Sequence, residues 1–235
     1  MDRSVLGRGE LIQILREKKA KVDELIFRWL PQSHETKELD LLNRMMRDYP
    51  GRGGKGLRGT LCLLTCQALG REEEEALPTA AALEIFQSWI LIRDDIEDMS
   101  EERRGEPTLH ERYGVPLAIN ASDALYARMW DLLLTNRSVL GDEKTFELLN
   151  EFTRMTIHTT EGQHIELSWV NDDRWDLSEE DYYAMCRKKT SWYTCITPLR
   201  LGGVIGGADQ KLMDAFIPFG MDLGVAFQIQ DDVLN

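Results

Sequence analysis

The stretch that decides the fold is LIRDDIEDMSEERRG, residues 91–105. It holds four acidic residues within five positions, and an Arg-Arg pair stands just before its last glycine. On an α-helix, Asp94 and Asp98 lie four residues apart, so their carboxylates leave the same face roughly 40° apart. Residues 81–92, which come before them, are mostly apolar. This pattern indicates that the acids close a buried helix.

Carboxylates at this spacing suit a divalent cation. Like charges one helical turn apart repel each other unless something compensates them. Mg²⁺ takes oxygen ligands and usually needs only one or two carboxylates plus substrate phosphates. Arg103 and Arg104 would suit the phosphates, because a guanidinium group binds them bidentately. A solvated acidic helix end is the alternative, and the apolar residues ahead of the acids argue against it.

Composition limits the class of protein. The chain has 235 residues, of which 43% are hydrophobic, enough for one domain over residues 1–235 with a substantial core. The net charge of −13 argues against a nucleic-acid surface. We find no unbroken apolar run of about 20 residues and no signal peptide, so we expect a soluble, cytoplasmic protein without a membrane span. The four cysteines are expected to be free thiols, with Cys62 and Cys66 buried.

A second motif is PGRGGKGLRG, residues 50–59, with five glycines and three basic residues. Glycines let a backbone approach an anion closely, and the start of the helix that follows favours negative charge. Lys55 and Arg58 lie three residues apart and could meet one phosphate group, with Arg52 close by in sequence. The loop is not a Walker motif, because GKS/T and a preceding strand are missing.

The fold class is expected to be all-α, because apolar residues recur at helical spacing and no strand pattern of any length is present. Helices are expected at 10–30, at 38–49 before Pro50, at 61–69, from Pro78 through the first acids, at 109–113, 115–134 and 143–167, after a capping box at Ser178 and Asp181, and at 214–235. The small residues within 199–207 would allow close helix contact.

The helix that carries the first acids changes character along one face. Phe86, Gln87 and Ile90 come before Asp94 and Asp98 at three- and four-residue spacings. A face that passes from apolar to acidic suits a molecule with a hydrocarbon tail and an anionic head. Ordinary core packing is the alternative for Phe86 and Ile90.

A second acidic helix end is FQIQDDVLN, residues 227–235. On a helix, Gln228, Asp231, Asp232 and Asn235 share one face. Two acidic patches on separate helices, together with basic anchors, define a candidate site. His164 has no second histidine at ligand spacing, so we give it a structural or solvent role.

These motifs together resemble the trans-isoprenyl diphosphate synthases, also called polyprenyl synthetases, of the short-chain geranylgeranyl or farnesyl type. The matching pieces, in order, are GGKGLR (53–58), DDIED with RRG (94–98 and 103–105), GQ (162–163), KT (189–190) and FQIQDDVLN (227–235). The resemblance covers nearly the whole chain. It implies an isoprenoid synthase helical bundle around a central cavity, a homodimer, and three Mg²⁺ ions when substrate is bound.

The resemblance also implies roles for individual residues. The residues expected to ligate Mg²⁺, bridging the allylic diphosphate, are Asp94, Asp98 and Asp231. The others expected to act in catalysis are Asp95, Arg103, Lys189, Thr190, Gln228 and Asp232. The residues expected to bind the substrates are Lys55, Arg58, Gln87, Arg103, Arg104, Gln163 and Lys189. Among these, Thr190 and Gln163 would offer oxygen dipoles near a carbocation.

The reaction that this resemblance implies joins isopentenyl diphosphate to an allylic diphosphate (dimethylallyl, geranyl or farnesyl). Mg²⁺ assists ionisation to an allylic cation, and the product would be farnesyl or geranylgeranyl diphosphate. Two alternatives are a class I terpene cyclase and a non-catalytic subunit of a heteromeric synthase. A cyclase would be expected to replace DDVLN by an asparagine–serine/threonine–glutamate motif and would not need Lys55 and Arg58.

Product length in the family depends on residues just upstream of the first acids, which here are Phe86, Trp89 and Ile90. The bulk of Trp89 predicts a short product, whereas the helical face favours Phe86 and Ile90 as the lining of the pocket. Either Trp89 or this pair could therefore form its floor. The chain departs from the family in having Gly56 where a basic residue is usual. Family members also continue past the position of Asn235, so we expect this chain to lack their C-terminal helices.

Overall fold

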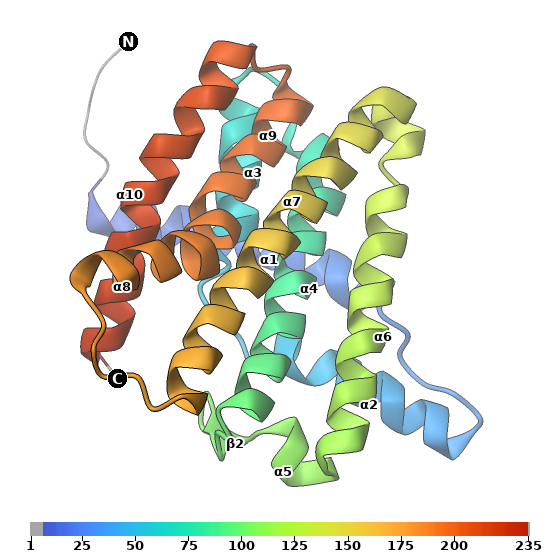
Figure 1. Ribbon diagram of the computed structural model, residues 1–235. Helices are drawn as coiled ribbons and strands as arrows, with labels where there is room; N and C mark the ends of the chain where they lie inside the picture. Colours follow the sequence, from blue (N-terminus) through green and yellow to red (C-terminus); the bar gives the residue numbers. More distant parts are fainter. Residues whose placement is uncertain (1–6, 235) are drawn as a thin grey trace. The chain divides into compact units, whose positions relative to one another are not determined.

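The computed structural model describes residues 7–234, and these form two compact units that are each discontinuous in sequence. The first unit is Met1–Thr60 with Leu77–Thr135, and the second is Leu61–Ala76 with Asn136–Asn235. The elements, labelled in Figure 1, are α1 (Arg8–Trp29), α2 (Lys37–Gly51), α3 (Leu57–Ala68), α4 (Glu73–Glu97), β1 (Glu102–Arg103), β2 (Glu106–Pro107), α5 (Leu109–Tyr113), α6 (Val115–Leu134), α7 (Arg137–Asn171), α8 (Glu179–Cys186), η1 (Arg187–Ile196), α9 (Thr197–Gly206) and α10 (Gln210–Leu234).

The all-α prediction is confirmed over the described residues, in which β1 and β2 are a two-residue antiparallel pair. α5 and α6 have the predicted bounds. The capping box at Ser178 is also present: its Oγ accepts from the Asp181 N–H at 3.2 Å, and its own N–H donates to Asp181 Oδ2 at 2.9 Å. Helical periodicity was therefore a reliable guide to the elements.

Two prolines do not mark the helix ends that we predicted for them. Pro50 lies inside α2, whose end is closed by the Arg52 N–H, which donates to the carbonyls of Asp48 and Tyr49. Pro78 lies in the second turn of α4, which begins at Glu73. Each proline therefore removes one intrahelical N–H donor near an end of its helix.

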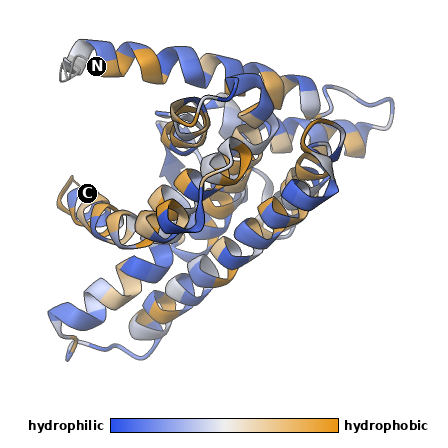
Figure 2. Cartoon of the chain, turned by 90° about the horizontal axis from the view of Figure 1, so that it is seen from above, coloured by the Kyte–Doolittle hydropathy of each residue, from blue (hydrophilic) through white to orange (hydrophobic). Residues whose placement is uncertain are grey.

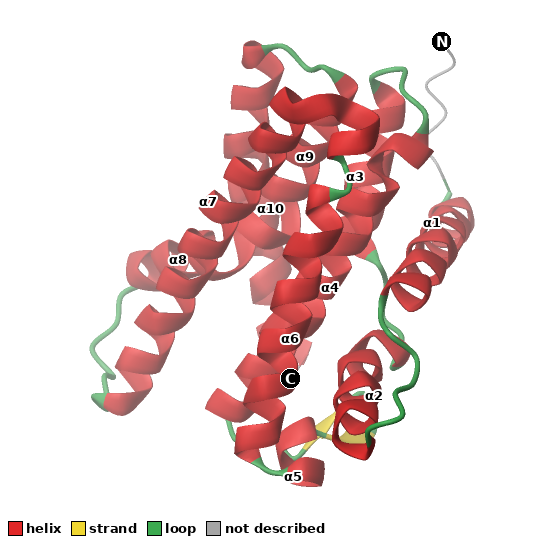
Figure 3. Ribbon diagram, turned by 90° about the vertical axis from the view of Figure 1, so that its right-hand side faces the viewer, coloured by secondary structure: helices red, strands yellow, loops and turns green. Residues whose placement is uncertain are grey.

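The first unit has α2 packed against α6 and α1. Hydrophobic and hydrophilic residues alternate along the helices of the chain (Figure 2). The large side chains fully buried in this unit include Ile26, Met45, Leu83, Ile85, Phe86, Leu125 and Met129. The two short strands lie beside the C-terminal part of α2 (Figure 3). The helix that carries the acids of the first motif is therefore anchored in a well-packed core.

The second unit is built around η1, a π-helix that packs against α7 and α10. Glycines allow these close contacts, since an added Cβ would collide in each case: Gly162 with Lys189, Gly220 with Ile196, and Gly224 with Ser191. π-helical segments occur mostly as insertions in α-helices and often at functional sites. Here the segment carries Lys189 and Thr190.

The small-residue stretch 199–207 makes the close contacts that its composition predicts. A Cβ on Gly202 would collide with Cys62, and one on Gly206 would collide with Leu69. All four cysteines are buried free thiols, which confirms the expectation for Cys62 and Cys66.

Among the described helices, α10 is long and apolar enough to cross a membrane by length and composition alone. One such helix is weak evidence for a span, because core helices of soluble proteins pass the same test. α10 also packs against η1, α8 and α9, and Asp214 and Asp222 interrupt its apolar sequence.

Candidate functional site

In the first unit, Asp95 is the centre of a buried polar network. Its side chain is fully buried. One carboxylate oxygen, Oδ2, accepts a hydrogen bond from the Tyr49 hydroxyl, and the other, Oδ1, accepts from Arg103 Nε at 2.8 Å and from Arg103 Nη2. Burial raises the pKa of Tyr49, and the hydrogen bond to Asp95 raises it further. Both oxygens of Asp95 are therefore engaged within the protein.

Asp94 and Asp98 lie on successive turns, as the sequence predicts. The Asp98 N–H donates to the Asp94 carbonyl at 2.8 Å, so the helical turn continues one residue past α4. Arg103 Nη2 lies 3.3 Å from Asp94 Oδ2 and compensates its charge. Burial alone would lower the pKa of Arg103, but Asp95 and Asp94 outweigh it and raise that pKa.

These acids fit a magnesium ion in their donor chemistry. Asp94 is half-buried and Asp98 is exposed, and both offer hard oxygen donors. Within residues 7–234, no three or more His, Cys, Asp or Glu side chains are arranged to hold an ion. Such carboxylates suit an ion whose shell is completed by phosphate oxygens and water.

Positively charged side chains lie close together in two segments of the first unit: the glycine loop, residues 50–59, and the hairpin formed by β1 and β2. Arg104 Nη1 donates to the Gly53 carbonyl. Burial lowers the pKa of Arg104, and the charges of Arg103, Arg52 and Arg58 lower it further. Cations this close to one another favour an anion beside them.

Two other features of this region bear on the predicted substrate contacts. The Oε1 atom of Gln87 is buried and has no hydrogen-bond partner among the described residues, which leaves an acceptor for a ligand. Gly56 has a φ of +60°, and an added Cβ would lie 2.9 Å from the Cβ and Cγ atoms of Lys19. This crowding gives a physical reason for glycine at that position.

Two of the three residues predicted to set product length, Phe86 and Trp89, lie in an aromatic cluster. Trp89 contacts Phe86 on α4, with ring centroids 5.1 Å apart, and Tyr126 on α6 at 4.6 Å. Phe86 is fully buried, and Ile90 is half-buried. Tyr126 was not identified from the sequence, because no local pattern relates it to residues on α4.

In the second unit, the KT and FQIQDD motifs meet through hydrogen bonds. The Thr190 hydroxyl donates to Gln228 Oε1, and Gln228 Nε2 donates to Asp232 Oδ1 at 2.8 Å. Lys189 forms an ion pair with Glu166 of α7. The predicted neighbours on α10 are thus linked to η1 by side chains.

The remaining predicted residues of this unit are placed as follows. Asp232 Oδ2 accepts from the Tyr182 hydroxyl, a partner that the sequence did not reveal. Asp231 is exposed, and Gln163 is buried on α7. Asn235 lies outside the described residues. Burial raises the pKa of Tyr182, as does its bond to Asp232.

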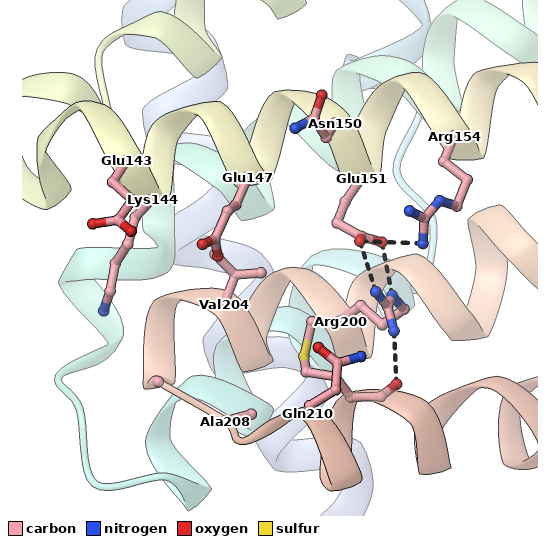
Figure 4. A pocket seen from close by; sticks show the side chains of 12 residues that line it. Glu143, Lys144, Glu147, Asn150, Glu151, Arg154, Arg200, Val204, Ala208 and Gln210 are labelled. Carbon is pink, nitrogen blue, oxygen red and sulfur yellow. Dashed lines mark hydrogen bonds and ion pairs between the residues drawn. The ribbon is translucent and has the colours of Figure 1, made fainter.

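A separate cavity of about 540 Å³ lies between α7, α9 and the start of α10 (Figure 4). Arg200 occupies its wall, with Nε and Nη2 each 2.7 Å from Glu151 and Nη1 2.7 Å from the Met213 carbonyl. None of the predicted site residues lines this cavity. Its buried charges are paired with each other, which favours a structural role.

The fold and the site define a class: an all-helical protein with two acidic helix ends, of which the first adjoins a cluster of cations. Residues 39–235 match the polyprenyl synthetase family. The chain belongs to this family, and its fold is the isoprenoid synthase helical bundle.

Individual relatives agree with this assignment. The chain is 36% identical to geranylgeranyl diphosphate synthase of Sulfolobus acidocaldarius over 78% of this chain and 54% of that protein. It is similar to the crystal structure of geranylgeranyl pyrophosphate synthetase from Pyrococcus horikoshii, with 31% identity and a TM-score of 0.86 over 96% of this chain and 66% of that one. A third relative is geranylgeranyl pyrophosphate synthase of Corynebacterium glutamicum, complexed with isoprenyl diphosphate and magnesium (27% identity, TM-score 0.83, 95% and 68% coverage).

The chain spans about half to two thirds of the length of the curated relatives it matches.

Proposed function

We propose that the chain acts as a short-chain trans-prenyltransferase. It would condense isopentenyl diphosphate with a dimethylallyl, geranyl or farnesyl diphosphate to give geranylgeranyl or farnesyl diphosphate. The observation that carries this proposal is the arrangement in the first unit, where Asp94 pairs with Arg103 and the Arg104 guanidinium reaches the glycine loop. Carboxylates that could hold a metal ion and cations that could hold a phosphate thus belong to one unit.

The first unit would bind both diphosphates. Asp94 and Asp98 would hold Mg²⁺, which when bound neutralises the leaving diphosphate. Arg103 would contact the allylic diphosphate, while a second set would hold isopentenyl diphosphate: Lys55, Arg58, Gln87 and Arg104. Asp95, buried behind Arg103, would keep its guanidinium oriented.

The family resemblance also implies roles for residues of the second unit. Asp231 is exposed and is proposed as a further Mg²⁺ ligand, with three ions in all as the family resemblance implies. Lys189 and Gln228 would lie close to the diphosphate, and Asp232 would fix the Gln228 amide through their hydrogen bond. Thr190 and Gln163 would place oxygen dipoles near the cation.

The proposed chemistry needs no protein nucleophile. The allylic C–O bond breaks and diphosphate leaves with the electron pair. The double bond of isopentenyl diphosphate then attacks the cation, forming a new C–C bond, and a proton is lost to a base such as the released diphosphate. Apolar walls would be needed to exclude water from the cation. Trp89, Phe86 and Ile90 would limit the length of the hydrocarbon chain.

We also propose that the protein is cytoplasmic and that it works as a homodimer, as the family resemblance implies for the dimer. Light scattering after gel filtration would measure the oligomeric state. A mass of one chain would contradict the dimer without bearing on the chemistry.

The proposed activity is tested by incubating the protein with Mg²⁺, labelled isopentenyl diphosphate and each allylic starter in turn. We expect products that end at one chain length, and we expect Asp94→Asn and Asp231→Asn each to lower kcat by at least 100-fold. Consumption of the allylic diphosphate without incorporation of isopentenyl diphosphate would support a terpene cyclase instead. No consumption at all would overturn catalysis by this chain alone and support a partner-subunit role.

A further inference from the structure

Arg52 makes contacts that its sequence motif does not suggest. It belongs to the basic glycine loop, yet its side chain is almost fully buried and pairs with Asp48 on α2. Its Nη1 donates to the carbonyls of Arg103 at 3.0 Å and Glu106 at 3.1 Å, and its Nη2 donates to the Pro107 carbonyl at 2.8 Å. With Nε on Asp48, four of its five N–H groups have protein acceptors. Arg52 is therefore engaged with the hairpin and is not available to grip a phosphate.

The hairpin formed by β1 and β2 needs such support. It has two residues in each strand, and its turn includes Arg104 at a φ of 58° and Gly105 at 77°. A strand pair this short has little stability of its own. Arg52 bonds carbonyls in both strands, and the residue between them, Arg104, donates to Gly53 just after α2.

Tyr49 provides a second contact between α2 and the same arginines. It is buried and lies one turn before Arg52, whose guanidinium sits 4.5 Å from the centre of its ring. The Tyr49 hydroxyl donates to Asp95, and Asp95 accepts two hydrogen bonds from Arg103. One end of α2 thus holds the Arg103 backbone through Arg52 and its side chain through Tyr49 and Asp95.

We infer that Tyr49 and Arg52 are positioning residues that preorganise Arg103 and Arg104 for a diphosphate ligand. This inference rests on the proposed function for its ligand, though not for the contacts themselves. Neither residue would touch the substrate. Groups that orient metal-binding residues commonly change affinity or activity by about 10- to 100-fold when removed, and we expect an effect of that order here. A loosened hairpin would keep both guanidinium groups but present them in many orientations.

The chain offers a matched control for this idea. Arg47, on the same helix, also donates to two carbonyls, those of Phe27 at 2.8 Å and Leu30 at 2.9 Å, and its guanidinium lies 4.8 Å from the Phe27 ring centre. Its acceptors belong to α1 and the residue after it, away from the hairpin. Arg47→Met and Arg52→Met therefore each remove a guanidinium that bonds carbonyls and lies over an aromatic ring, and only Arg52→Met removes bonds to the hairpin.

The first measurement is binding of inorganic pyrophosphate in the presence of Mg²⁺, by calorimetry, together with the thermal midpoint of each variant. We expect Arg52→Met to weaken binding by about tenfold or more and Tyr49→Phe to weaken it by a smaller factor. Arg47→Met should also lower the midpoint but leave affinity within about twofold. In the prenyl transfer assay, the change in Arg52→Met should fall mainly on KM for the diphosphates. Equal affinities for Arg47→Met and Arg52→Met would overturn the positioning role.

The second measurement does not depend on any ligand. Hydrogen exchange of residues 100–108 should become faster in Arg52→Met than in Arg47→Met, because the hairpin loses its support. Unchanged exchange there would overturn the inference whatever the binding data show. If the wild-type protein bound no pyrophosphate, the proposed function would fail, and the exchange result would still decide whether α2 holds the hairpin.

Discussion

Trp89 of α4 and Tyr126 of α6 stack with their ring centroids 4.6 Å apart and their planes tilted by 30°. Trp89 is predicted from the sequence to limit product length, whereas nothing in the sequence singles out Tyr126. Tyr126 also meets Trp130 edge-on at 5.8 Å, so an aromatic series runs along this side of the first unit. The bulk of Trp89 is therefore backed by a second ring.

We expect Trp89→Ala to lengthen the product by at least one isoprene unit, because it removes a large side chain from the proposed floor. Tyr126→Ala should also lengthen the product, but by less, because without the Tyr126 ring the Trp89 side chain can move away from the proposed floor. Chromatography of the dephosphorylated alcohols measures both. Tyr126→Phe keeps the ring and serves as the control. An unchanged product distribution in Trp89→Ala would show that the floor lies elsewhere.

The buried ion pair between Arg200 and Glu151 should matter for stability. Both side chains are less than 10% exposed and are joined by two hydrogen bonds of 2.7 Å. Glu151→Leu would leave a buried, uncompensated guanidinium, at an expected cost of about 3–5 kcal/mol in the free energy of unfolding. Denaturant titration measures this cost. Arg154→Ala, which removes a half-exposed neighbour 3.5 Å from Glu151, should cost about 1 kcal/mol or less.

Close helix contact in the second unit should make Gly224 intolerant of a side chain. A Cβ there would collide with the backbone and side chain of Ser191. We expect Gly224→Ala to lower stability by about 1–3 kcal/mol, as overpacking of a core does. Gly51→Ala is the control, because its Cβ would make an ordinary 3.7 Å contact with Phe27. Equal thermal midpoints for the two variants would contradict the close packing of α10 on η1.

The environment of His158 gives stability a pH dependence. Its ring stacks on Trp192 at 4.2 Å. Burial lowers the pKa of His158, the charges of Lys188 and Arg154 lower it further, and Glu161 opposes them. The unfolded chain therefore takes up this proton first, and stability falls as the pH drops from about 6.5 towards the lower, folded-state pKa.

Replacing His158 by phenylalanine should keep the stack and flatten stability between about pH 7 and pH 5.5. Urea titrations across that range measure the slope. His164→Gln, at an exposed position, serves as the control. A wild-type protein that gained stability as the pH fell through this range, with the gain lost in His158→Phe, would reverse the sign derived from the structure.

The buried thiols should be slow to react. Burial raises the pKa of Cys66 to about 11, and the remaining cysteines are also buried. A thiol of this kind is almost entirely protonated at pH 8, and the thiolate is the reactive form. We expect a disulfide reagent to label none of the four cysteines within seconds in the native protein and all four in guanidinium chloride. Rapid native labelling would show that a helix contact opens readily.

Local sequence patterns anticipated much of the fold and of the candidate site. Helical spacing is a property of neighbouring residues, so the bounds of α6 and the cap of α8 followed from the sequence directly. The spacing of Asp94 and Asp98 placed both on one face for the same reason. The order of the motifs pointed to the family to which the chain belongs.

Only the tertiary structure decided which side chains meet. Tyr49 and Asp95 are 46 residues apart, and no local pattern relates them. The sequence places Arg52 in the same basic glycine loop as Lys55 and Arg58, because composition records charge but not the acceptors that a folded chain brings within reach. Hydrogen bonds to distant carbonyls form only once the helices pack. The fold therefore decides which arginines could bind a ligand and which ones hold the ligand-binding arginines in place.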